Sequence, residues 1–409
     1  MKQEIRARID QIRQGIVPDG YTKTRSEITP TTWTPACLGD IYTERKEPGN
    51  ESLPLLTVSI HSGVSDGELD EDELPKKVKR IEDKSQYKRA ATGDLVFNMM
   101  RAWQGAIGTV HTEGMVSPAY IVAKPNDKVY PPFMDYYMKS ARMVGIINRQ
   151  SYGVTDFRKR LYWDSFAPIP CVLPPVREQK RIAEILSTQD KAIELQGRKI
   201  EELKRFKKGC LEKMFPRKGQ KVPEKRFPGF TDDWEQRKVQ DVANRFDNLR
   251  IPVAANLRVH GTTPYYGANG IQDYVEGFTH DGEFVLVAED GANDLKNYPV
   301  KCVNGRIWVN NHAHVLQGKA GIADNSFLAF AISQSDIESL LVGGGRAKLN
   351  AETLMSIEFR LPCLQEQYRI GEYLTQLDHL ITLHQRKMEE MKRQKKTLMQ
   401  LLLTGIVRV

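Results

Sequence analysis

Apolar residues recur with a 4-3-4-3 spacing through two long segments of the chain, residues 178–215 and 366–403. This spacing is typical of a coiled-coil seam, in which two helices bury one stripe of side chains against each other. The first stripe contains Ile182, Leu186, Ile193, Ile200 and Leu203, and the second contains Ile370, Leu374, Leu377, Ile381, Met388 and Met391. Polar residues occupy matching layers, at Gln196 and His384 and again at Lys207 and Lys395. The pattern predicts two long helices that pair antiparallel within the chain.

The two segments are copies of each other. Their 38 residues align without a gap, and 17 positions are identical. Neither segment contains a proline, so each predicts one helix roughly 57 Å long. Seam spacing alone does not identify the partner, and two alternatives stay open: each helix packs on its own domain, or the helices pair between chains. The chain is therefore predicted to consist of two halves, each ending in the same helix.

The remaining sequence has the short apolar runs of a mixed α and β protein. Each half opens with a tryptophan, Trp33 or Trp234, which is followed five residues later by a similar short motif. Strands are expected at 53–60, 94–98, 107–110, 120–123, 284–288, 302–303, 307–309 and 314–316, and helices at 4–16, 133–143 and 326–341. Proline-rich extended stretches, 166–175 and 357–362, lead into the two long helices.

These patterns predict an α+β fold: two α/β domains joined by two long helices that form an antiparallel coiled coil with pseudo-twofold symmetry. A segment with three prolines and two glycines, 216–231, is expected to be the linker between the halves. The expected boundaries are 1–175 for the first domain with a short N-terminal helix, 176–215 for the first long helix, 216–231 for the linker, 232–361 for the second domain and 362–409 for the second long helix.

Composition narrows the class of protein. The 409 residues carry a formal net charge of +8, and ten Lys or Arg against three Glu lie between Arg198 and Lys221. This excess fits either a solvated helix face or a polyanion partner. Five scattered cysteines without a CxxC pair favour reduced thiols over disulfides or a zinc site. No apolar window is long enough to cross a membrane, and the charged N-terminus does not resemble a secretion signal. We therefore expect a cytoplasmic protein.

The repeated helices, the tryptophan-led openings and the linker together resemble the specificity subunit of type I restriction–modification enzymes. The matching residues are PPVREQ at 174–179, LPCLQEQ at 361–367, RFPGF at 226–230 followed by DWE at 233–235, MRAWQGAIG at 100–108 and LLLTGIVRV at 401–409. The resemblance covers essentially the whole chain, but it is weak within the two domains, which in this family are variable target-recognition domains. The recognised bases therefore stay open.

The resemblance implies a non-catalytic subunit that reads a bipartite, non-palindromic site on double-stranded DNA. Two modification (methyltransferase) subunits would grip the helices, and two restriction (motor-nuclease) subunits would join for cleavage. S-adenosylmethionine, ATP and Mg²⁺ are expected in those partner subunits, and no cofactor is expected in this chain. The alternatives are a stand-alone enzyme on nucleic acid and a coiled-coil scaffold without a role on DNA.

Catalytic motifs are weak in this sequence. No GxGxxG or GxxxxGK(S/T) occurs. Tyr130-Pro131-Pro132-Phe133 imitates the motif of adenine methyltransferases but lacks its polar first residue, so a proline turn before a helix is favoured. Pro18-Asp19 with Glu44-Arg45-Lys46 imitates a nuclease metal site, yet Pro18-Asp19-Gly20 is a typical turn. His312 and His314 share one face of a strand without a third ligand nearby, which favours a structural or DNA-facing role over a metal site.

Base contacts are expected from loops near the ends of the domains, where arginine and glutamine can bind base edges and lysine can bind phosphate. The glycines at 343–345 could cradle a phosphate or form a bare loop. The candidate DNA-binding residues are Arg101, Trp103, Gln104, Arg158, Lys159, Arg160, Arg346 and Lys348.

A partner surface is expected at the start of each repeat, because two unlike domains have no reason to share exposed polar residues unless the same partner binds both. The candidate residues are Glu178, Gln179, Arg181 and Glu184 in the first copy and Glu366, Gln367, Arg369 and Glu372 in the second. Helix capping would explain Glu178 and Glu366 alone.

Overall fold

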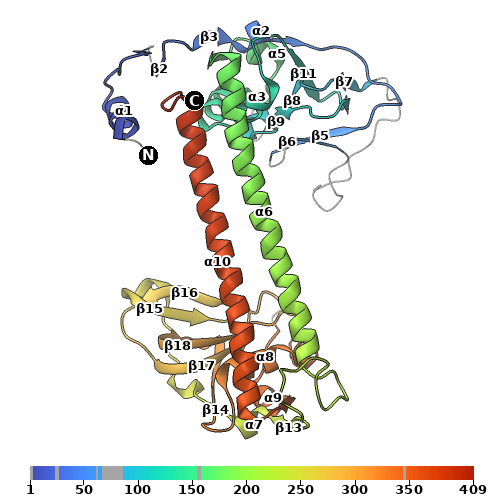
Figure 1. Cartoon of the computed structure of the whole chain (residues 1–409), viewed down its shortest axis with the longest axis vertical. Helices are drawn as coiled ribbons and strands as arrows, with labels where there is room; N and C mark the ends of the chain where they lie inside the picture. Colours follow the sequence, from blue (N-terminus) through green and yellow to red (C-terminus); the bar gives the residue numbers. More distant parts are fainter. Residues whose placement is uncertain (1–2, 24–26, 61–62, 67–85, 154–157, 344–346) are drawn as a thin grey trace. The chain divides into compact units, whose positions relative to one another are not determined.

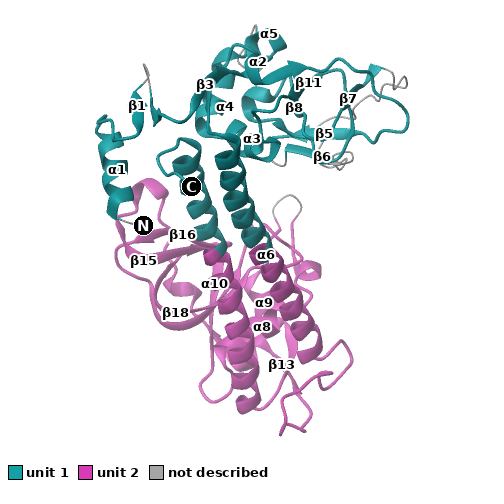
Figure 2. Cartoon of the chain, turned by 45° about the horizontal axis from the view of Figure 1, so that its top comes forward, with its two compact units in different colours: residues 1–195, 388–409 teal, residues 196–387 magenta. Residues whose placement is uncertain are grey.

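The computed structural model describes residues 3–23, 27–60, 63–66, 86–153, 158–343 and 347–409. The chain divides into two compact units (Figure 2). Unit 1 comprises residues 1–195 and 388–409, and unit 2 comprises residues 196–387. Each unit contains one domain of strands and short helices together with a segment of each long helix, so the α+β fold class is confirmed. Within the described residues, no helix is long and apolar enough to span a membrane.

The two repeats form the long helices α6 (Val176–Met214) and α10 (Leu364–Leu403), labelled in Figure 1. In unit 1, Glu178 at the start of α6 binds Arg408, which follows the end of α10, and Asp190 further along α6 binds Lys395 of α10. In unit 2, Gln196 of α6 contacts His384, and Lys207 of α6 contacts Asp378. The partner residue moves back along α10 as the position in α6 advances. The expected antiparallel, intramolecular pairing is thus confirmed in each unit, whereas interlocking of the seam as a coiled coil stays a prediction.

Seam residues are buried most completely where the helices meet the domains. Ile182 and Leu186 lie in the hydrophobic core of unit 1, and Ile370 and Leu374 lie in that of unit 2. Ile200, Leu203 and Ile381 are also buried, whereas Ile193, Leu377, Met388 and Met391 are half-buried. The helix ends therefore pack on their own domains, as one alternative held, while the inner parts of the seam face the other helix.

Unit 1 is built on an antiparallel sheet with the strand order β4-β11-β8-β9. These strands are β4 (Tyr42–Glu44), β11 (Tyr120–Pro125), β8 (Leu95–Asn98) and β9 (Ile107–Thr109). Smaller antiparallel pairs are β1 (Tyr21–Lys23) with β2 (Ile28–Pro30), β5 (Leu56–Ser59) with β6 (Gly63–Asp66), β7 (Lys88–Ala90) with β10 (Gly114–Val116), and β3 (Thr34–Cys37) with β12 (Pro170–Leu173). The helices are α1 (Gln3–Arg13), α2 (Leu38–Ile41), η3 (Ala102–Gln104), α3 (Pro131–Met138), α4 (Ala141–Gln150) and α5 (Trp163–Phe166).

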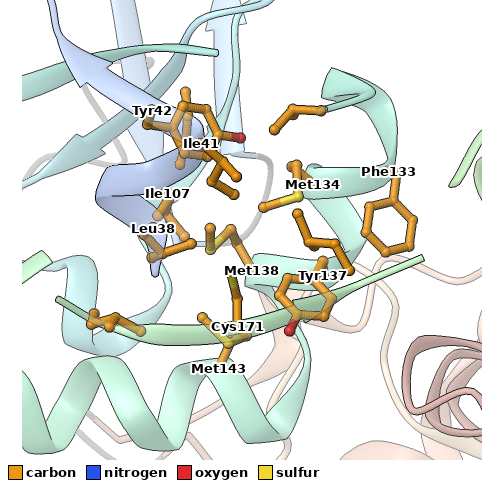
Figure 3. Close-up of a cluster of buried hydrophobic side chains, with 14 of the residues drawn as sticks. Leu38, Ile41, Tyr42, Ile107, Phe133, Met134, Tyr137, Met138, Met143 and Cys171 are labelled. Atoms are coloured by element: carbon orange, nitrogen blue, oxygen red, sulfur yellow. The ribbon is translucent and has the colours of Figure 1, made fainter. Parts of the chain in front are cut away.

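The core of unit 1 gathers apolar side chains from helices and strands that are distant in sequence (Figure 3). Leu38 and Ile41 of α2 face Met134 and Met138 of α3, and Cys171 of β12 lies among them. Each such side chain contributes roughly 1.5–3 kcal/mol on full burial, so this cluster is a main source of the unit's stability. Burial raises the pKa of the Cys171 thiol to about 12, which keeps it protonated and unreactive.

Unit 2 is built on a six-stranded sheet with the order β14-β19-β17-β18-β15-β16, in which only the β15–β18 contact is parallel. These strands are β14 (Ala243–Arg245), β19 (Ala313–Gly318), β17 (His280–Ala288), β18 (Val300–Val309), β15 (His260–Gly267) and β16 (Gly270–Val275), and β13 (Glu235–Lys238) pairs with β20 (Glu358–Leu361). The helices are α7 (Val239–Val242), η4 (Asp247–Leu249), η5 (Ala255–Leu257), α8 (Asn325–Ser333), η6 (Glu338–Leu340) and α9 (Ala351–Ser356).

The two units share one internal plan. The order β4-β11-β8-β9 of unit 1 corresponds to β14-β19-β17-β18 of unit 2, and unit 2 adds the hairpin β15–β16. The two repeats are 188 positions apart in the sequence, and this repeat offset also relates residues upstream of the long helices. Buried residues match in pairs at that offset: Leu161 with Leu349, Phe166 with Leu354, Ile169 with Ile357 and Leu173 with Leu361. The duplication therefore includes the scaffold that supports each helix.

Several sequence-based elements need correction. The helix expected at 133–143 is two helices, because the Ser140 side chain accepts a hydrogen bond from the Met143 N–H and starts α4 anew. The helix expected at 326–341 ends at Ser333. The strands expected at 302–303 and 307–309 are one strand, which passes through Gly305 at a φ of 94°. The extended stretch expected from residue 166 begins only at Pro170, since Trp163–Phe166 forms α5.

The predicted linker, 216–231, contains no helix or strand, but its residues pack against unit 2. Phe227 packs against the core of unit 2, with its ring 5.7 Å from that of Tyr373. Arg226 makes a two-point ion pair with Glu366 at the start of α10. These contacts fix the segment on unit 2.

Candidate nucleic-acid interface

Each long helix begins with a buried glutamate that binds a tryptophan and an arginine. In unit 1, Glu178 accepts hydrogen bonds from the Trp33 indole at 3.2 Å and from the Arg408 guanidinium at 2.6 and 2.8 Å. The carboxylate carries the charge that a helix N-terminus favours, and the arginine neutralises it. The glutamate thus ties the domain opening and the chain's last residues to the start of α6.

Unit 2 repeats this arrangement. Glu366 accepts hydrogen bonds from the Trp234 indole at 3.1 Å and from Arg226 at 2.8 and 2.6 Å. The side chain of Glu366 is fully buried, and that of Arg226 is only 14% exposed. Hydrogen bonding to Glu366 raises the pKa of the Arg226 guanidinium, which keeps this guanidinium charged at neutral pH.

The glutamine that follows each glutamate binds backbone groups around the start of the same helix. The Gln179 amide accepts from the Tyr130 N–H and donates to the carbonyls of Lys128 and Pro174, at 2.8–2.9 Å. Gln367 likewise accepts from the Asp324 N–H and donates to the carbonyls of Ile322 and Pro362. Each glutamine thus provides hydrogen-bond partners for three backbone groups around the start of its helix.

The prediction that Glu178, Gln179, Glu366 and Gln367 form an exposed partner surface is therefore wrong. Their exposed fractions are 6%, 0%, 0% and 1%, and their hydrogen bonds lie within their own unit. The four remaining candidates, Arg181, Glu184, Arg369 and Glu372, are exposed. Arg181 lies 3.4 Å from Glu184, and Glu372 accepts a hydrogen bond from Gln376. These weak surface contacts leave their charged groups accessible to a partner.

The polar layers between α6 and α10 form matched contacts in the two units. Lys207 binds Asp378 in unit 2, and Lys395 binds Asp190 in unit 1. An aromatic ring of the nearby domain lies under each lysine, Phe330 at 5.1 Å and Tyr136 at 5.5 Å. The Tyr136 hydroxyl also donates to Asp190, and burial together with this bond raises the pKa of the hydroxyl. The lysines of the predicted seam therefore join each domain to the helix pair.

In unit 1, the structure brings two of the predicted DNA-binding segments together. The Leu161 N–H donates to the Met99 carbonyl, which places 158–161 beside the loop between β8 and β9. The Lys159 ammonium lies 5.8 Å from the centre of the Trp103 ring and donates to Asn148. Arg101 and Gln104, on the same loop, are exposed. The segments thus form one basic and aromatic surface of unit 1.

Arg158 and Arg160 lie at the edge of this surface, and both are exposed. Arg160 pairs through its backbone with Tyr152 and reaches the Tyr162 hydroxyl at 3.4 Å. The Tyr152 side chain is 58% exposed, and its ring lies 5.5 Å from that of Tyr162. Neither tyrosine was predicted as a site residue. Their position beside Arg158-Lys159-Arg160 in the sequence was the available signal.

In unit 2, Lys348 is exposed but engaged in an ion pair with Glu289 at 2.9 Å. Its backbone pairs with Val342, as the Arg160 backbone pairs with Tyr152 in unit 1. Arg346 and the glycines at 344–345 lie outside the described residues. Lys348 corresponds to Arg160 at the repeat offset, and Arg346 corresponds to Arg158.

A buried charge network holds this part of unit 2. Glu289 also binds Arg250 at 2.6 Å, and Asp247 binds His314 at 2.7 Å and the Val315 N–H. Burial alone would raise the pKa of Asp247. The hydrogen bonds from His314 and Val315, with the nearby charges, outweigh it and hold that pKa below its ordinary value. The network anchors the segment before α9 to the sheet.

The motifs that imitate catalytic sites have structural partners. Pro131 and Pro132 begin α3, and Phe133 is buried in the core. Glu44 pairs with Lys46 at 3.2 Å, and Gly20 after Asp19 adopts the positive φ of a turn. His312 binds Asp290 at 2.5 Å, and His314 is buried between Asp247 and the Leu349 carbonyl. Among the described residues, no three His, Cys, Asp or Glu side chains group as metal ligands.

Comparison with known proteins decides the family. The sequence matches the type I restriction modification DNA specificity domain over residues 70–205 and 231–393, which is well over half of the chain. The chain belongs to the type I restriction–modification specificity family. The two matched regions each end within one of the long helices, so the sequence duplication corresponds to two copies of the family domain.

Relatives within the specificity family align over different lengths. A putative type I restriction enzyme specificity subunit of Haemophilus influenzae is 44% identical over 157 residues, which span 38% of this chain and 40% of that protein. The MjaVIII specificity subunit of Methanocaldococcus jannaschii is 23% identical, with 80% of this chain and 83% of that protein aligned. The putative MjaX specificity subunit of the same organism is 24% identical, with 96% and 97% aligned.

Solved structures support the same fold. The type I restriction–modification S subunit of M. genitalium matches with a TM-score of 0.59 at 13% identity, covering 90% of this chain and 96% of that chain. A chain from a structural study of complex assembly and conformational transition of the type I R-M system matches with a TM-score of 0.56 at 16% identity, covering 93% and 99%. At these identities the comparison supports the fold alone.

Proposed function

We propose that this specificity subunit reads a bipartite, non-palindromic site on double-stranded DNA and directs methylation or cleavage by partner subunits. The observation that carries the proposal is that the two units share the same supporting fold but differ in the loops on it. Both units have the same sheet order and the same buried glutamate and glutamine at the helix start, yet the loops around these scaffolds differ in sequence. Unlike loops on like scaffolds should select two unlike half-sites.

In unit 1 the proposed reading surface is the cluster of Arg101, Trp103, Gln104 and the segment 158–160. Arginine and glutamine can form bidentate contacts with guanine and adenine edges in the major groove, and lysine suits phosphate. The overall charge of +8 supports binding to a polyanion. In unit 2 the counterpart is expected at Arg346 and Lys348, of which Lys348 is bound by Glu289.

The paired helices are proposed to act as a pseudo-twofold coiled-coil spacer between two target-recognition domains. Two modification subunits would bind the helices, and two restriction subunits would join for cleavage. These partners would supply S-adenosylmethionine, ATP and Mg²⁺ chemistry in the cytoplasm. The specificity subunit itself would bind DNA and position it, without catalysing a reaction.

The division of labour can be tested with the purified subunit. Alone it should bind DNA weakly, transfer no methyl group from S-adenosylmethionine and cut no DNA, because reading and chemistry reside in different chains. After reconstitution with the modification subunit, adenine methylation at one sequence motif should appear. Methyl transfer or cleavage by the specificity subunit alone would contradict the proposal in favour of a stand-alone enzyme. No binding in any mixture would favour a scaffold.

Charge reversal at the exposed helix positions tests the proposed partner surface. Arg181→Glu together with Arg369→Glu should reduce co-purification of the modification subunit at least about tenfold. The two introduced glutamates would repel the acidic groups of the modification subunit that the arginines are proposed to bind. Arg237→Glu, exposed on β13 outside both long helices, is the matched control, since Arg237 also makes only a surface ion pair. If the double variant retains the modification subunit at the wild-type ratio, the surface lies elsewhere.

A further inference from the structure

The order of strands in the two sheets shows which loop of unit 2 corresponds to the candidate DNA-binding loop of unit 1. In unit 1 the loop carrying Arg101, Trp103 and Gln104 connects β8 to β9. Because β8 and β9 correspond to β17 and β18 in the two sheets, the counterpart in unit 2 is the loop of residues 289–299 between β17 and β18. The neighbours match as well. In unit 1 the Leu161 N–H donates to the carbonyl of Met99, the first residue of the loop, and in unit 2 the Leu349 N–H donates to the carbonyl of Glu289, likewise the first residue of its loop.

Three neighbouring segments hold this loop. The Asn269 side chain, in the turn between β15 and β16, donates to the Gly291 carbonyl at 2.9 Å and accepts from the Asn293 N–H at 3.0 Å. The Glu289 N–H donates to the His312 carbonyl, and Asp290 binds the His312 ring. The buried Tyr298 donates from its hydroxyl to the Ala288 carbonyl. A loop held at so many points loses little freedom on binding.

The acidic groups of the loop are used to hold its shape. Asp294 accepts hydrogen bonds from the N–H groups of Lys296 and Asn297 and from the Asn297 side chain, at 2.9–3.0 Å. These bonds hold the pKa of Asp294 below its ordinary value. The exposed groups left to face a ligand are the Asn293 amide and the Lys296 ammonium. Neither side chain forms a hydrogen bond within the part of the chain that the structure describes.

We propose that the 289–299 loop is a base-reading loop of unit 2, in which Asn293 reads an adenine edge and Lys296 contacts a phosphate. This inference rests on the proposed function and adds residues to it. A side-chain amide can accept from N6 and donate to N7 of adenine at once, and it cannot make the same pair of bonds with guanine. The ammonium supplies a contact independent of sequence.

The test uses the full subunit co-expressed with its modification subunit in a host without other methyltransferases, with methylation mapped across the genome. Asn293→Ala should reduce methylation of the wild-type motif about five- to 150-fold and relax it at one base pair of one half-site. Asn293→Asp should shift that position toward cytosine, because a carboxylate accepts from the cytosine amino group. Lys296→Ala should weaken DNA binding for all sequences and lower its salt dependence.

The matched control is Asn304→Ala, an exposed asparagine on β18 of the same hairpin but away from the loop. It should leave the motif and its methylation unchanged. The loop should stay folded in the Asn293 variants, because Asn269 binds the Asn293 backbone and not its side chain. An unchanged motif at full efficiency in Asn293→Ala would overturn the assignment, as would a uniform loss without relaxation at any base. A wild-type complex that methylates no split motif would instead overturn the proposed function.

Discussion

Glu366→Ala is expected to destabilise unit 2 by about 3 kcal/mol, because it leaves the Arg226 guanidinium and the Trp234 indole without their shared acceptor. For a unit of this size, such a loss lowers the midpoint of its thermal unfolding by roughly 6–12 °C. Scanning calorimetry of the full chain measures this, and hydrogen exchange at the start of α10 locates it. Glu366→Gln, which keeps one acceptor, should recover part of the loss.

The corresponding variant in unit 1 provides an internal comparison. Glu178→Ala should destabilise its unit less than Glu366→Ala does, because the Arg408 side chain is 34% exposed, against 14% for Arg226, and water can solvate it after the change. Glu235→Ala removes an exposed glutamate of β13 and should leave unfolding unchanged. Equal unfolding midpoints for Glu366→Ala and Glu235→Ala would show that the buried cluster does not stabilise the helix start.

Lengthening the helix pair is expected to abolish methylation at the original spacing. Four residues inserted after Leu203 lengthen α6 by about 6 Å, but that change alone would move Lys207 away from Asp378. A second insertion of four residues after Leu380 restores this contact and keeps that of Gln196 with His384, since the helices pair antiparallel and Asp378 then moves together with Lys207. If the helices set the distance between the half-sites, the double-insertion variant should prefer a spacer longer by one or two base pairs, with both half-sites unchanged.

The control inserts four glycine and serine residues after Gly219, in an exposed turn of the 216–231 segment. It adds chain length without lengthening either helix, so the original spacing should persist. Genome-wide methylation mapping distinguishes the variants. Full methylation at the original spacing by the double-insertion variant would show that the helices do not set the distance.

The helices were predictable because a 4-3 spacing over many turns has one structural interpretation. The same spacing could also have corrected the error at the helix starts. Glu178 and Gln179 precede Ile182 by four and three residues, as Glu366 and Gln367 precede Ile370, so all four lie on the buried face. Arg181 and Glu184 fall outside that face and are exposed. The polarity of the glutamates and glutamines suggested that they are exposed, but their position on the helix face that meets the domain makes them buried.

The counterpart loops could not be found in the same way. The equivalence of the β8–β9 and β17–β18 loops follows from the order of strands in two sheets, which depends on pairings between segments distant in sequence. The β15–β16 hairpin belongs to the six-stranded sheet of unit 2, whereas the described hairpin between β4 and β8 of unit 1, β5–β6, forms a separate two-stranded sheet. The segments between corresponding strands therefore differ, and a gapless alignment does not find the matching loops. Residues such as Asn269 and Asn293 become candidates only once the sheet brings their loops together.

The most direct test of two-part recognition replaces residues 233–348 with the corresponding segment of another specificity subunit whose methylated motif is known. The exchange leaves the buried glutamates, the helix pair and the whole of unit 1 in place. Genome-wide mapping of adenine methylation in a host carrying the hybrid and the modification subunit gives the readout. The account predicts a new motif in which one half-site comes from the donor and the other is unchanged. Loss or replacement of both half-sites would contradict it.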